Sequence, residues 1–355
     1  MATNRLLPPP ECCEPLASLV TRFGGSVEIR SAAARVEYDL PPHATAEIRE
    51  YWRGESQIEI APGIVARLPG GKVFGAGIVL APDGKSIARD VSLDFGKPFE
   101  EHWLLTSDKL VPPQWVGGST AVIATNLGTG YGHWLLDELP RLLVLRRSEA
   151  DTLIAHASQP FTGAALGQLG WTGTVLPMDR RTHFQCEQLV VPGFSSTLGH
   201  PTPHGLGLIT EFTAAFHSGT SAFGERIYVT REQARRRKIS NEAELWGELQ
   251  AAGFAKVRLE ELTWPEQINA FRHAKVVVAP HGAGLANLVF CRPGTRAVEI
   301  FNRSYLHGCF WRLAALQGLD YRPVVPDAAE PLTQATASNR LDIVADLQQV
   351  RAALR

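Results

Sequence analysis

The stretch VVVAPHGAGLANLVF, from Val276 to Phe290, decides the fold of the second half of this chain. An apolar run ends at Pro280, a histidine and two spaced glycines follow, and a second apolar run comes next. This order is typical of a buried parallel strand that turns directly into a helix. Because open α/β sheets bind ligands outside the carboxyl ends of their strands, we expect the turn at residues 281–284 to lie where a ligand binds.

The composition of this turn suits a phosphate or a diphosphate. Gly282 and Gly284, with Ala283 between them, let backbone amides approach a ligand without an intervening side chain. A helix that begins around Ala283 to Leu285 would direct its N-terminal amides and its dipole at an anion. Two side chains add to this: His281 as a donor, and Asn287 one helical turn further on. A turn whose glycines serve only packing stays an open alternative, because an isolated G-x-G is a weak signal.

Strand and helix patterns alternate from Arg226 onward, which predicts a parallel sheet with crossover helices and an α/β fold class. The expected strands are RIYVT, AKVRLE, AKVVVA, RAVEIF and YRPVV. Between the first two, Asn241 and Glu244 resemble a capping box and Gly253 closes the helix. The last residues, 339–355, are predicted to form an amphipathic helix.

A chain of 355 residues is long for one hydrophobic core, so two domains are predicted. Residues 1–220 are expected to form the first, with a β-rich start rich in turn signals followed by alternating strands and helices. Residues 221–330 are expected to form the second, and residues 331–355 a helix that packs back on the first domain. A polar passage and a helical pattern at residues 195–224 are the predicted junction.

Composition excludes several classes of protein. A net charge of −1 gives no reason to expect nucleic acid as a partner, and no apolar run approaches the ~20 residues of a membrane span. The five cysteines form no C-x-x-C pair, which fits a reducing cytoplasm rather than a disulfide framework. We therefore expect a cytoplasmic protein, with attachment at the inner face of the membrane left open. D-x-D, H-E-x-x-H, Walker and G-x-S-x-G motifs are all absent.

A basic cluster follows the strand RIYVT, in the sequence YVTREQARRRKISN. The planar guanidinium group suits phosphate, so Arg231, Arg236 and Lys238 are candidates for a diphosphate site. A solvated surface or a nucleic-acid patch would also be basic, although no second basic stripe supports the latter. Asn241 is a candidate for ligand contact too, but a helix N-cap is the favoured interpretation of its local sequence.

A third segment, GYGHWLLDELPRLLVLRR at residues 130–147, has a histidine, an aspartate and an arginine at helical spacing. His133, Asp137 and Arg141 would share one helix face, and Pro140 would kink or restart the helix. A His–Asp pair can remove a proton from a hydroxyl, with the carboxylate orienting the ring. An Asp137–Arg141 surface pair with a capping histidine is the alternative.

Taken in order, the three segments resemble the catalytic region of glycosyltransferase family 61. The family pattern is similar to an N-x-x-H-x-x-x-D segment, an Arg-rich R-x-I-x-N segment, and H-G-A-G-L-x-N followed by P-G and a strand that ends in glutamate. Here these are residues 130–137, RRKISN at 236–241, and 281–287 with Glu299 further on. Gly130 stands where the family usually has asparagine, which puts the detail of the acceptor side in doubt.

The resemblance implies two Rossmann-like domains facing across a cleft, the GT-B arrangement, and inversion at the anomeric carbon without a metal. The implied substrates are a nucleotide-sugar donor, expected to be UDP-linked, and a glycan acceptor that is free or lipid-linked. The first domain would bring the acceptor, His133 as base and Asp137 as its orienting group, with Asp137 itself as the second choice of base. The second would hold the donor, with Glu299 on ribose or sugar. A non-catalytic nucleotide- or glycan-binding protein and a hydrolase of phosphorylated sugars are the competing classes.

Overall fold

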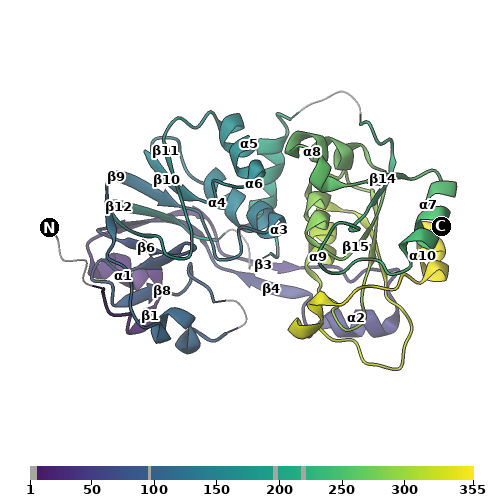
Figure 1. Ribbon diagram of the computed structural model, residues 1–355, viewed down its shortest axis with the longest axis horizontal. Coiled ribbons are helices and arrows are strands. Elements are labelled where there is room, and N and C mark those ends of the chain that lie inside the picture. The colour runs from purple at the N-terminus through teal and green to yellow at the C-terminus, as the bar shows by residue number, and fades with distance from the viewer. Residues whose placement is uncertain (1–5, 95–96, 195–198, 217–220) are drawn as a thin grey trace. The chain divides into compact units, whose positions relative to one another are not determined.

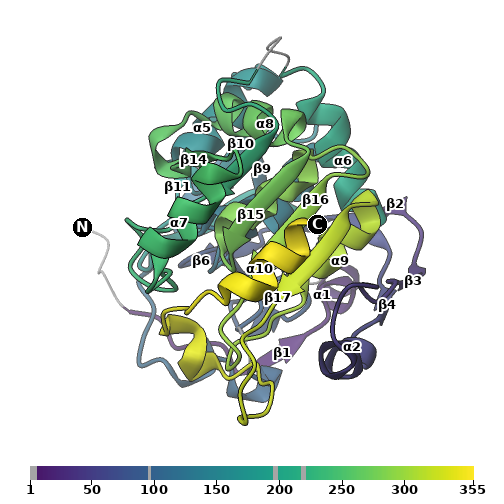
Figure 2. The same ribbon diagram turned by 90° about the vertical axis from the view of Figure 1, so that its right-hand side faces the viewer.

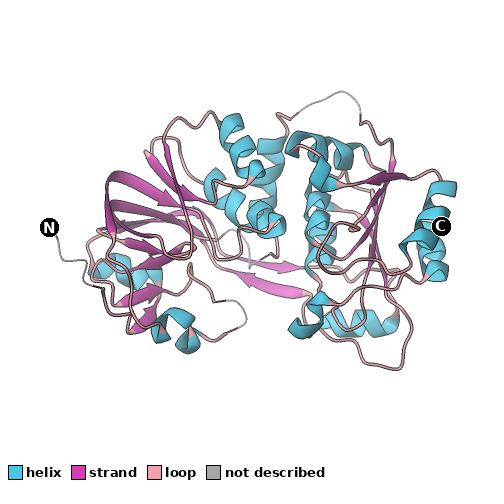
Figure 3. Cartoon of the chain, viewed as in Figure 1, coloured by secondary structure: helices cyan, strands magenta, loops and turns pink. Residues whose placement is uncertain are grey.

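The computed structural model describes residues 6–94, 97–194, 199–216 and 221–355. Packing divides the chain into two units, Met1–Ala34 with Ala61–Leu198 and Arg35–Ile60 with Gly199–Arg355. Residues 35–60 and 199–216, assigned to the first domain from the sequence, thus group with the second unit. The predicted junction falls in part on residues 195–198 and 217–220, which lie outside the described residues. Both units contain helices and strands, so the α/β class is confirmed (Figure 3).

The first unit is a mixed sheet with helices. Its strands are β1 (Cys12–Glu14), β2 (Ser26–Ser31), β5 (Gly63–Pro69), β6 (Lys72–Phe74), β7 (Ile78–Leu80), β8 (Ser86–Ala88), β9 (Gln114–Val122), β10 (Thr152–Ala155), β11 (Thr174–Pro177) and β12 (His183–Pro192). Its helical segments are α1 (Leu16–Arg22), η1 (Phe99–Glu101), η2 (Trp103–Thr106), α3 (Tyr131–His133), η3 (Trp134–Glu138), α4 (Leu139–Leu143) and α5 (Pro160–Leu169).

All ten of these described strands belong to one sheet, in the order β1-β8-β7-β6-β12-β9-β10-β11, with β5 also pairing β12 and β2 pairing β5. Strands β9, β10 and β11 run parallel, as expected for the alternating part of the chain. The long strand β12 joins this part to the β-rich start, because it is parallel to β9 on one edge and antiparallel to β5 and β6 on the other. The β-rich start is therefore continuous with the α/β part.

The second unit contains a five-stranded parallel sheet covered on both faces, and the strands β3 (Ala34–Glu37) and β4 (Gln57–Ile60) pair separately from it. The strands of the parallel sheet are β13 (Arg226–Val229), β14 (Ala255–Val257), β15 (Val276–Pro280), β16 (Arg296–Ile300) and β17 (Asp320–Val324). Its helical segments are α2 (Ala46–Arg53), α6 (Pro203–Thr213), α7 (Glu242–Ala251), η4 (Leu259–Glu261), α8 (Trp264–His273), η5 (Ala283–Phe290), α9 (Cys309–Gln317), η6 (Thr336–Arg340) and α10 (Leu347–Leu354). The five strands predicted from residue 226 onward are confirmed.

The parallel sheet has the strand order β14-β13-β15-β16-β17, which is the order of a flavodoxin-like doubly wound fold. Helices α7 and α10 cover one face and α8 and α9 the other (Figures 1 and 2). On the first of these faces Leu245, Leu249 and Val350 pack into one core with Tyr228 and Val298 of the strands. The expectation that the C-terminal helix packs on the first domain is therefore wrong, because the apolar side of α10 is buried on this sheet.

Residues 35–60 belong to the second unit because their aromatic side chains pack there. The ring of Trp52 stacks on Trp311, with centroids 5.1 Å apart and planes at 11°. The indole nitrogen of Trp311 donates to the carbonyl of Asp39 at 2.8 Å, and Arg312 binds the Glu55 carboxylate at 3.0 Å. Burial of these large aromatic surfaces stabilises the contact with the second unit. In the sequence, residues 35–60 nevertheless lie between two segments of the first unit.

The C-terminal segment is only partly helical. Residues 339–355 were predicted as one amphipathic helix, whereas α10 begins at Leu347, after Asp346 caps it by accepting from the amide of Gln349 at 3.0 Å. Residues 342–345 are extended instead, because they pair with residues 238–241. Among the described residues, no helix is both long enough and apolar enough to cross a bilayer.

Candidate active site

The strand order of the second sheet defines a switch point between β13 and β15. The chain leaves β13 toward α7 on one face and leaves β15 toward η5 on the other, beside α8 and α9. Connections that diverge in this way open a crevice at the carboxyl ends of the two strands, where doubly wound sheets bind ligands. The basic cluster and the glycine turn therefore meet at the edge where the sequence predicts a ligand.

Arg231 and Gly282 lie against each other at this edge. A β-carbon built on Gly282 would be 2.3 Å from Nη1 of Arg231 and 2.7 Å from its guanidinium carbon. The absence of a side chain at residue 282 thus makes room for a cation from the neighbouring strand end. Burial lowers the pKa of Arg231 to about 10, and the charge of Arg237 acts in the same direction. Two cations whose charges act on each other in this way favour an anionic ligand.

Arg237 has an unusual backbone conformation. With φ at 56°, it is the only non-glycine residue with a positive φ in the part of the chain that the structure describes. Its guanidinium carbon lies 5.5 Å from the ring centroid of Tyr305, and its Nε, like that of Arg231, is buried without a hydrogen-bond partner. Left-handed backbone at a non-glycine residue costs about 1–3 kcal/mol and persists where the surroundings impose it.

Those surroundings are the pairing of residues 238–241 with residues 342–345. The amide of Lys238 donates to the Asp342 carboxylate at 2.9 Å, and Ile239 is buried and bridges Ile343. The side chain of Asn241 donates to the carbonyl of Ala345 at 3.0 Å and accepts from its amide at 2.9 Å. This pairing fixes the residues immediately after Arg237 and so holds the arginine in place.

Asn241 therefore has a different local role from either predicted one. It occupies the N-cap position of α7, but its side chain makes no capping hydrogen bond there. The predicted capping box with Glu244 is wrong, because the nitrogen and the oxygen of the Asn241 side-chain amide both bind the backbone of Ala345. Gly253 does close α7, with φ at 77°.

His281 forms a buried hydrogen-bonded chain with two residues from adjacent strands. Its Nδ1 lies 2.5 Å from Oε1 of Glu299, and Oε2 of the same carboxyl accepts from the hydroxyl of Tyr321 at 2.5 Å. The exposed fraction of Glu299 is 0% and that of His281 4%. The ring of His281 stacks on Phe301 at 5.1 Å.

Burial favours the neutral form of both members of this pair. It holds the pKa of His281 well below its ordinary value, and the charges of Arg237 and Arg231 add to the effect. Burial also raises the pKa of the Glu299 carboxyl well above its ordinary value. When both groups are neutral, the carboxyl donates its proton to Nδ1, and the ring carries its single proton on Nε2.

The remaining predicted residues of this site differ in their surroundings. The side chain of Arg236 is exposed and donates to Asn339 at 3.4 Å. Asn287 is fully buried and does reach back to the turn, since its Nδ2 donates to the carbonyl of Gly284 at 3.1 Å. The segment that starts at Ala283 is a 3₁₀-helix rather than an α-helix, with i→i+3 hydrogen bonds that make a tighter turn.

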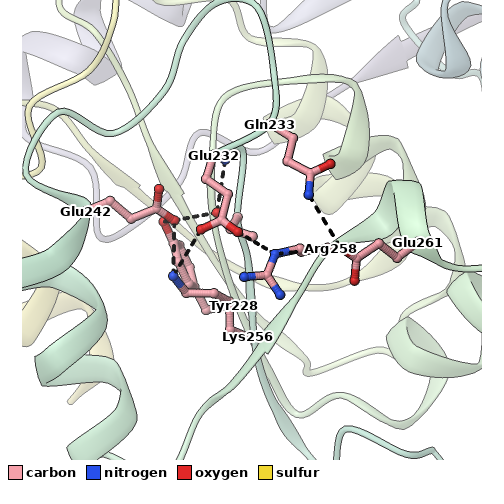
Figure 4. Close-up of polar contacts among 8 residues, drawn as sticks. Tyr228, Glu232, Gln233, Glu242, Lys256, Arg258 and Glu261 are labelled. Carbon is pink, nitrogen blue, oxygen red and sulfur yellow. Dashed lines mark hydrogen bonds and ion pairs between the residues drawn. The ribbon is translucent and has the colours of Figure 1, made fainter.

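A charged network on the other side of β13 orders the loop that carries Arg231 (Figure 4). Glu232 binds Arg258 and lies 3.5 Å from Nζ of Lys256, while Glu242 accepts from Tyr228 at 2.9 Å. Gln233 donates to Glu261 at 3.4 Å in the same network. Because acidic groups balance Lys256 and Arg258 here, these two cations are engaged within the fold.

In the first unit, His133 and Asp137 lie on the helical segment that follows β9. Nδ1 of His133 is 2.8 Å from Oδ2 of Asp137, and the two side chains are 31% and 1% exposed. Residues 134–138 form a π-helical turn before Pro140 restarts the helix as part of α4. The predicted contact of the His–Asp pair is confirmed, while its catalytic role stays a prediction.

The next residue, Glu138, is a buried carboxyl. Its Oε1 accepts from the amide and the hydroxyl of Thr125 at 2.5 and 3.0 Å, and Nε2 of His156 lies 3.5 Å away. Burial raises the pKa of Glu138 to about 8, against the lowering effect of the Thr125 hydrogen bonds. A β-carbon on Gly128 would lie 1.7 Å from Oε1, so the loop after β9 requires glycine at this position.

Arg141 is fully buried and not part of a surface pair. It donates to the carbonyls of Ile123 at 2.8 Å, Ala124 at 3.3 Å and Pro192 at 2.9 Å, which ties the ends of β9 and β12 together. The predicted alternative of an Asp137–Arg141 surface pair is therefore wrong. The π-helical turn shifts the helical spacing on which that alternative relied.

Residues 131–298 match the family model described as Glycosyltransferase 61. The matched region begins at α3, includes both the basic cluster and the glycine turn, and ends in β16. The resemblance predicted from the three segments is thus confirmed for residues 131–298, which are similar to glycosyltransferase family 61.

Among curated proteins, the chain is similar to Beta-1,2-xylosyltransferase RCN11 of Oryza sativa subsp. japonica. The two are 29% identical over 97 residues, which cover 24% of this chain and 18% of that protein. The match therefore spans less than a fifth of the relative's length.

Sequence reasoning missed two residues of the second unit. Arg237 was passed over in favour of Arg236, although the R-x-I-x-N pattern begins at Arg237 when Ile239 and Asn241 are aligned to it. Tyr321 was not singled out at all, and no local signal marks it, because its contact with Glu299 comes from a neighbouring strand.

Proposed function

We propose that this chain is an inverting glycosyltransferase that moves a sugar from a nucleotide-sugar donor, UDP-linked, to a hydroxyl of a glycan. The observation that carries the proposal is the group of Arg231, Arg237 and His281 around the glycine turn at the switch point of the second sheet. The family match and the similarity to a xylosyltransferase support the same class of reaction.

In this proposal the second unit binds the donor diphosphate. Arg231 and Arg237 supply charge-assisted hydrogen bonds from buried Nε atoms that have no other partner. His281 and the turn residues Gly282–Gly284 complete the cradle, and Arg236 and Lys238 lie on the same loop as the two arginines. The fixed positive charges would stabilise the leaving diphosphate, so the reaction needs no metal ion.

The first unit supplies the base. His133 accepts the proton of the acceptor hydroxyl at Nε2, while Asp137 holds Nδ1 and stabilises the imidazolium that forms. The hydroxyl oxygen forms the new bond to the anomeric carbon as the bond from that carbon to the diphosphate oxygen breaks. The bonding electrons leave with the nucleotide diphosphate, and the configuration is inverted.

Three finer parts of the proposal come from the resemblance. These are the GT-B arrangement of two Rossmann-like units, a cytoplasmic location with an acceptor that is free or lipid-linked, and the choice of UDP. A panel of nucleotide sugars screened by thermal shift tests the last, because a ligand that binds only the native state raises the melting temperature.

Transfer of labelled sugar from the stabilising donor to a glycan then tests the activity itself. Inverted configuration in the product, seen by NMR, is the expected result. Stabilisation by a nucleotide without any turnover would favour a non-catalytic binding protein, and release of free sugar as the sole product would favour a hydrolase.

A further inference from the structure

Glu299 was expected to contact ribose or sugar, but it is closed off from any ligand. Its exposed fraction is 0%, and each carboxyl oxygen already has a partner, His281 on one side and Tyr321 on the other. A ligand oxygen would have to displace one of these partners inside the core. Any effect of Glu299 on a ligand must therefore act through a neighbour.

Three adjacent strands deliver the members of this chain of hydrogen bonds. Tyr321 lies on β17, Glu299 on β16, and His281 directly follows β15. The register pairs Ala279 with Glu299 and Ala297 with Tyr321, so the three side chains step across the sheet toward the switch point. Rigid strands hold such a chain more accurately than loops do.

The protonation of the Glu299 carboxyl decides which nitrogen of the imidazole ring carries a proton. The hydroxyl of Tyr321 donates to Oε2, so the proton that burial favours on this carboxyl lies on Oε1 and is donated to Nδ1 of His281. A neutral ring that accepts a hydrogen bond at Nδ1 carries its single proton on Nε2. Nε2 is then a donor, as a phosphate oxygen requires, rather than an acceptor that would repel it.

We propose that Glu299 is a positioning residue that holds His281 in the orientation and protonation state in which Nε2 donates a hydrogen bond to the donor diphosphate. This assignment rests on the proposed function for its ligand, but not for the state of the ring. Tyr321 holds the carboxyl from behind, and Phe301 fixes the ring plane by stacking.

Two substitutions separate this role from a packing role. In Glu299→Gln, the amide NH₂ can donate to Nδ1 while the amide oxygen accepts from Tyr321, so Nε2 keeps its proton. In Glu299→Leu, the side-chain volume is similar but Nδ1 loses its partner. We expect UDP affinity within about threefold of wild type for the first and a loss of about 10- to 100-fold for the second, as for loss of a charge-assisted hydrogen bond.

A double-mutant cycle with His281→Ala gives the decisive comparison. If Glu299 acts through the ring, Glu299→Leu should cost no further affinity once His281 is alanine. A further loss in that background, or a loss in Glu299→Gln as large as in Glu299→Leu, would overturn the assignment.

Nitrogen-15 NMR of the histidine ring decides the same question without a ligand. We expect His281 of the wild type at pH 7 to show a protonated Nε2, and Glu299→Gln to keep that signature. An unprotonated Nε2 in the wild type would overturn the inference even if UDP binds. Absence of binding by every nucleotide diphosphate, with Nε2 protonated, would instead count against the proposed function and leave the state of the ring established.

Discussion

The guanidinium group of Arg231 occupies the space that a side chain at Gly282 would need. Arg231 follows β13, and Gly282 follows β15. Nη1 of Arg231 lies 2.3 Å from the position that a β-carbon of residue 282 would take. The glycine of the H-G-A-G turn is therefore explained by close approach of a cation, since its extended backbone, with φ at 169°, is open to any residue.

Gly282→Ala should displace Arg231 and weaken nucleotide diphosphate binding by about tenfold or more, because one charge-assisted hydrogen bond is lost or distorted. Calorimetry with UDP measures the change. Gly247→Ala is the matched control: it lies within α7 with no atom within 4 Å of its new β-carbon. This control should stabilise the helix by about 0.5–1 kcal/mol and leave the affinity unchanged. Equal affinities for all three proteins would show that Arg231 does not bind the ligand.

Arg237→Ala and His281→Ala should each weaken UDP binding by about 1.5–3 kcal/mol, the range for a hydrogen bond to a charged group. Arg235→Ala, an exposed arginine of the same loop, provides the control. Arg236→Ala tests the original sequence-based choice. A greater loss for Arg236→Ala than for Arg237→Ala would reverse the order that burial and backbone geometry suggest.

Activity should survive EDTA, because arginine, histidine and backbone amides provide the positive charge opposite the leaving group. Initial rates of sugar transfer before and after chelation give the answer. A loss of turnover that manganese or magnesium restores would show that a metal ion is part of the site.

His133→Ala should lower turnover by about 10²–10⁴ while leaving donor affinity and melting temperature nearly unchanged, as for loss of a general base. Asp137→Asn should lower turnover less, because it weakens only the orientation of the ring. If Asp137→Asn is the more damaging of the two, Asp137 is the base. If neither matters, the base lies elsewhere.

Glu138 should make stability depend on pH. With a pKa of about 8 in the folded state against 4.5 for an ordinary glutamate, the folded protein keeps a proton that the unfolded chain releases. The contribution of this proton to the free energy of unfolding is fully present below about pH 4.5. It is lost as pH rises toward 8, at about 1.4 kcal/mol per pH unit. Glu138→Gln mimics the protonated form and should gain stability over wild type across this range.

Urea denaturation of both proteins at about pH 5, 6.5 and 8 measures this difference. Glu225→Gln, an exposed carboxyl paired with Lys275, serves as the surface control. A constant difference between wild type and Glu138→Gln would mean that Glu138 is ionised in the fold.

The parallel sheet of the second unit could be predicted from the sequence because its signals are local. Buried parallel strands have continuous apolar runs, and the turn at Gly282 follows one of them directly. The His133–Asp137 contact could also be predicted, since four residues separate partners on one helix face. Both depend on neighbours in sequence.

What could not be predicted depends on contacts between distant residues. The backbone conformation of Arg237 depends on the pairing of the following residues with residues 342–345. The place of residues 35–60 depends on the stacking of Trp52 on Trp311. The closure of Glu299 by Tyr321 likewise joins two strands. Local patterns contain no record of such partners.

The pairing of residues 238–241 with 342–345 also has a consequence for biosynthesis. Lys238 and its partner Asp342 are 104 positions apart, so the ribosome makes Arg237 and the glycine turn well before the segment that holds Arg237 in its left-handed conformation. During translation the nascent chain can fold β13, β14 and β15 with this arginine still unrestrained. A polypeptide that stalls before residue 342 would therefore contain the glycine turn and the basic cluster and still lack the pairing that fixes the residues after Arg237.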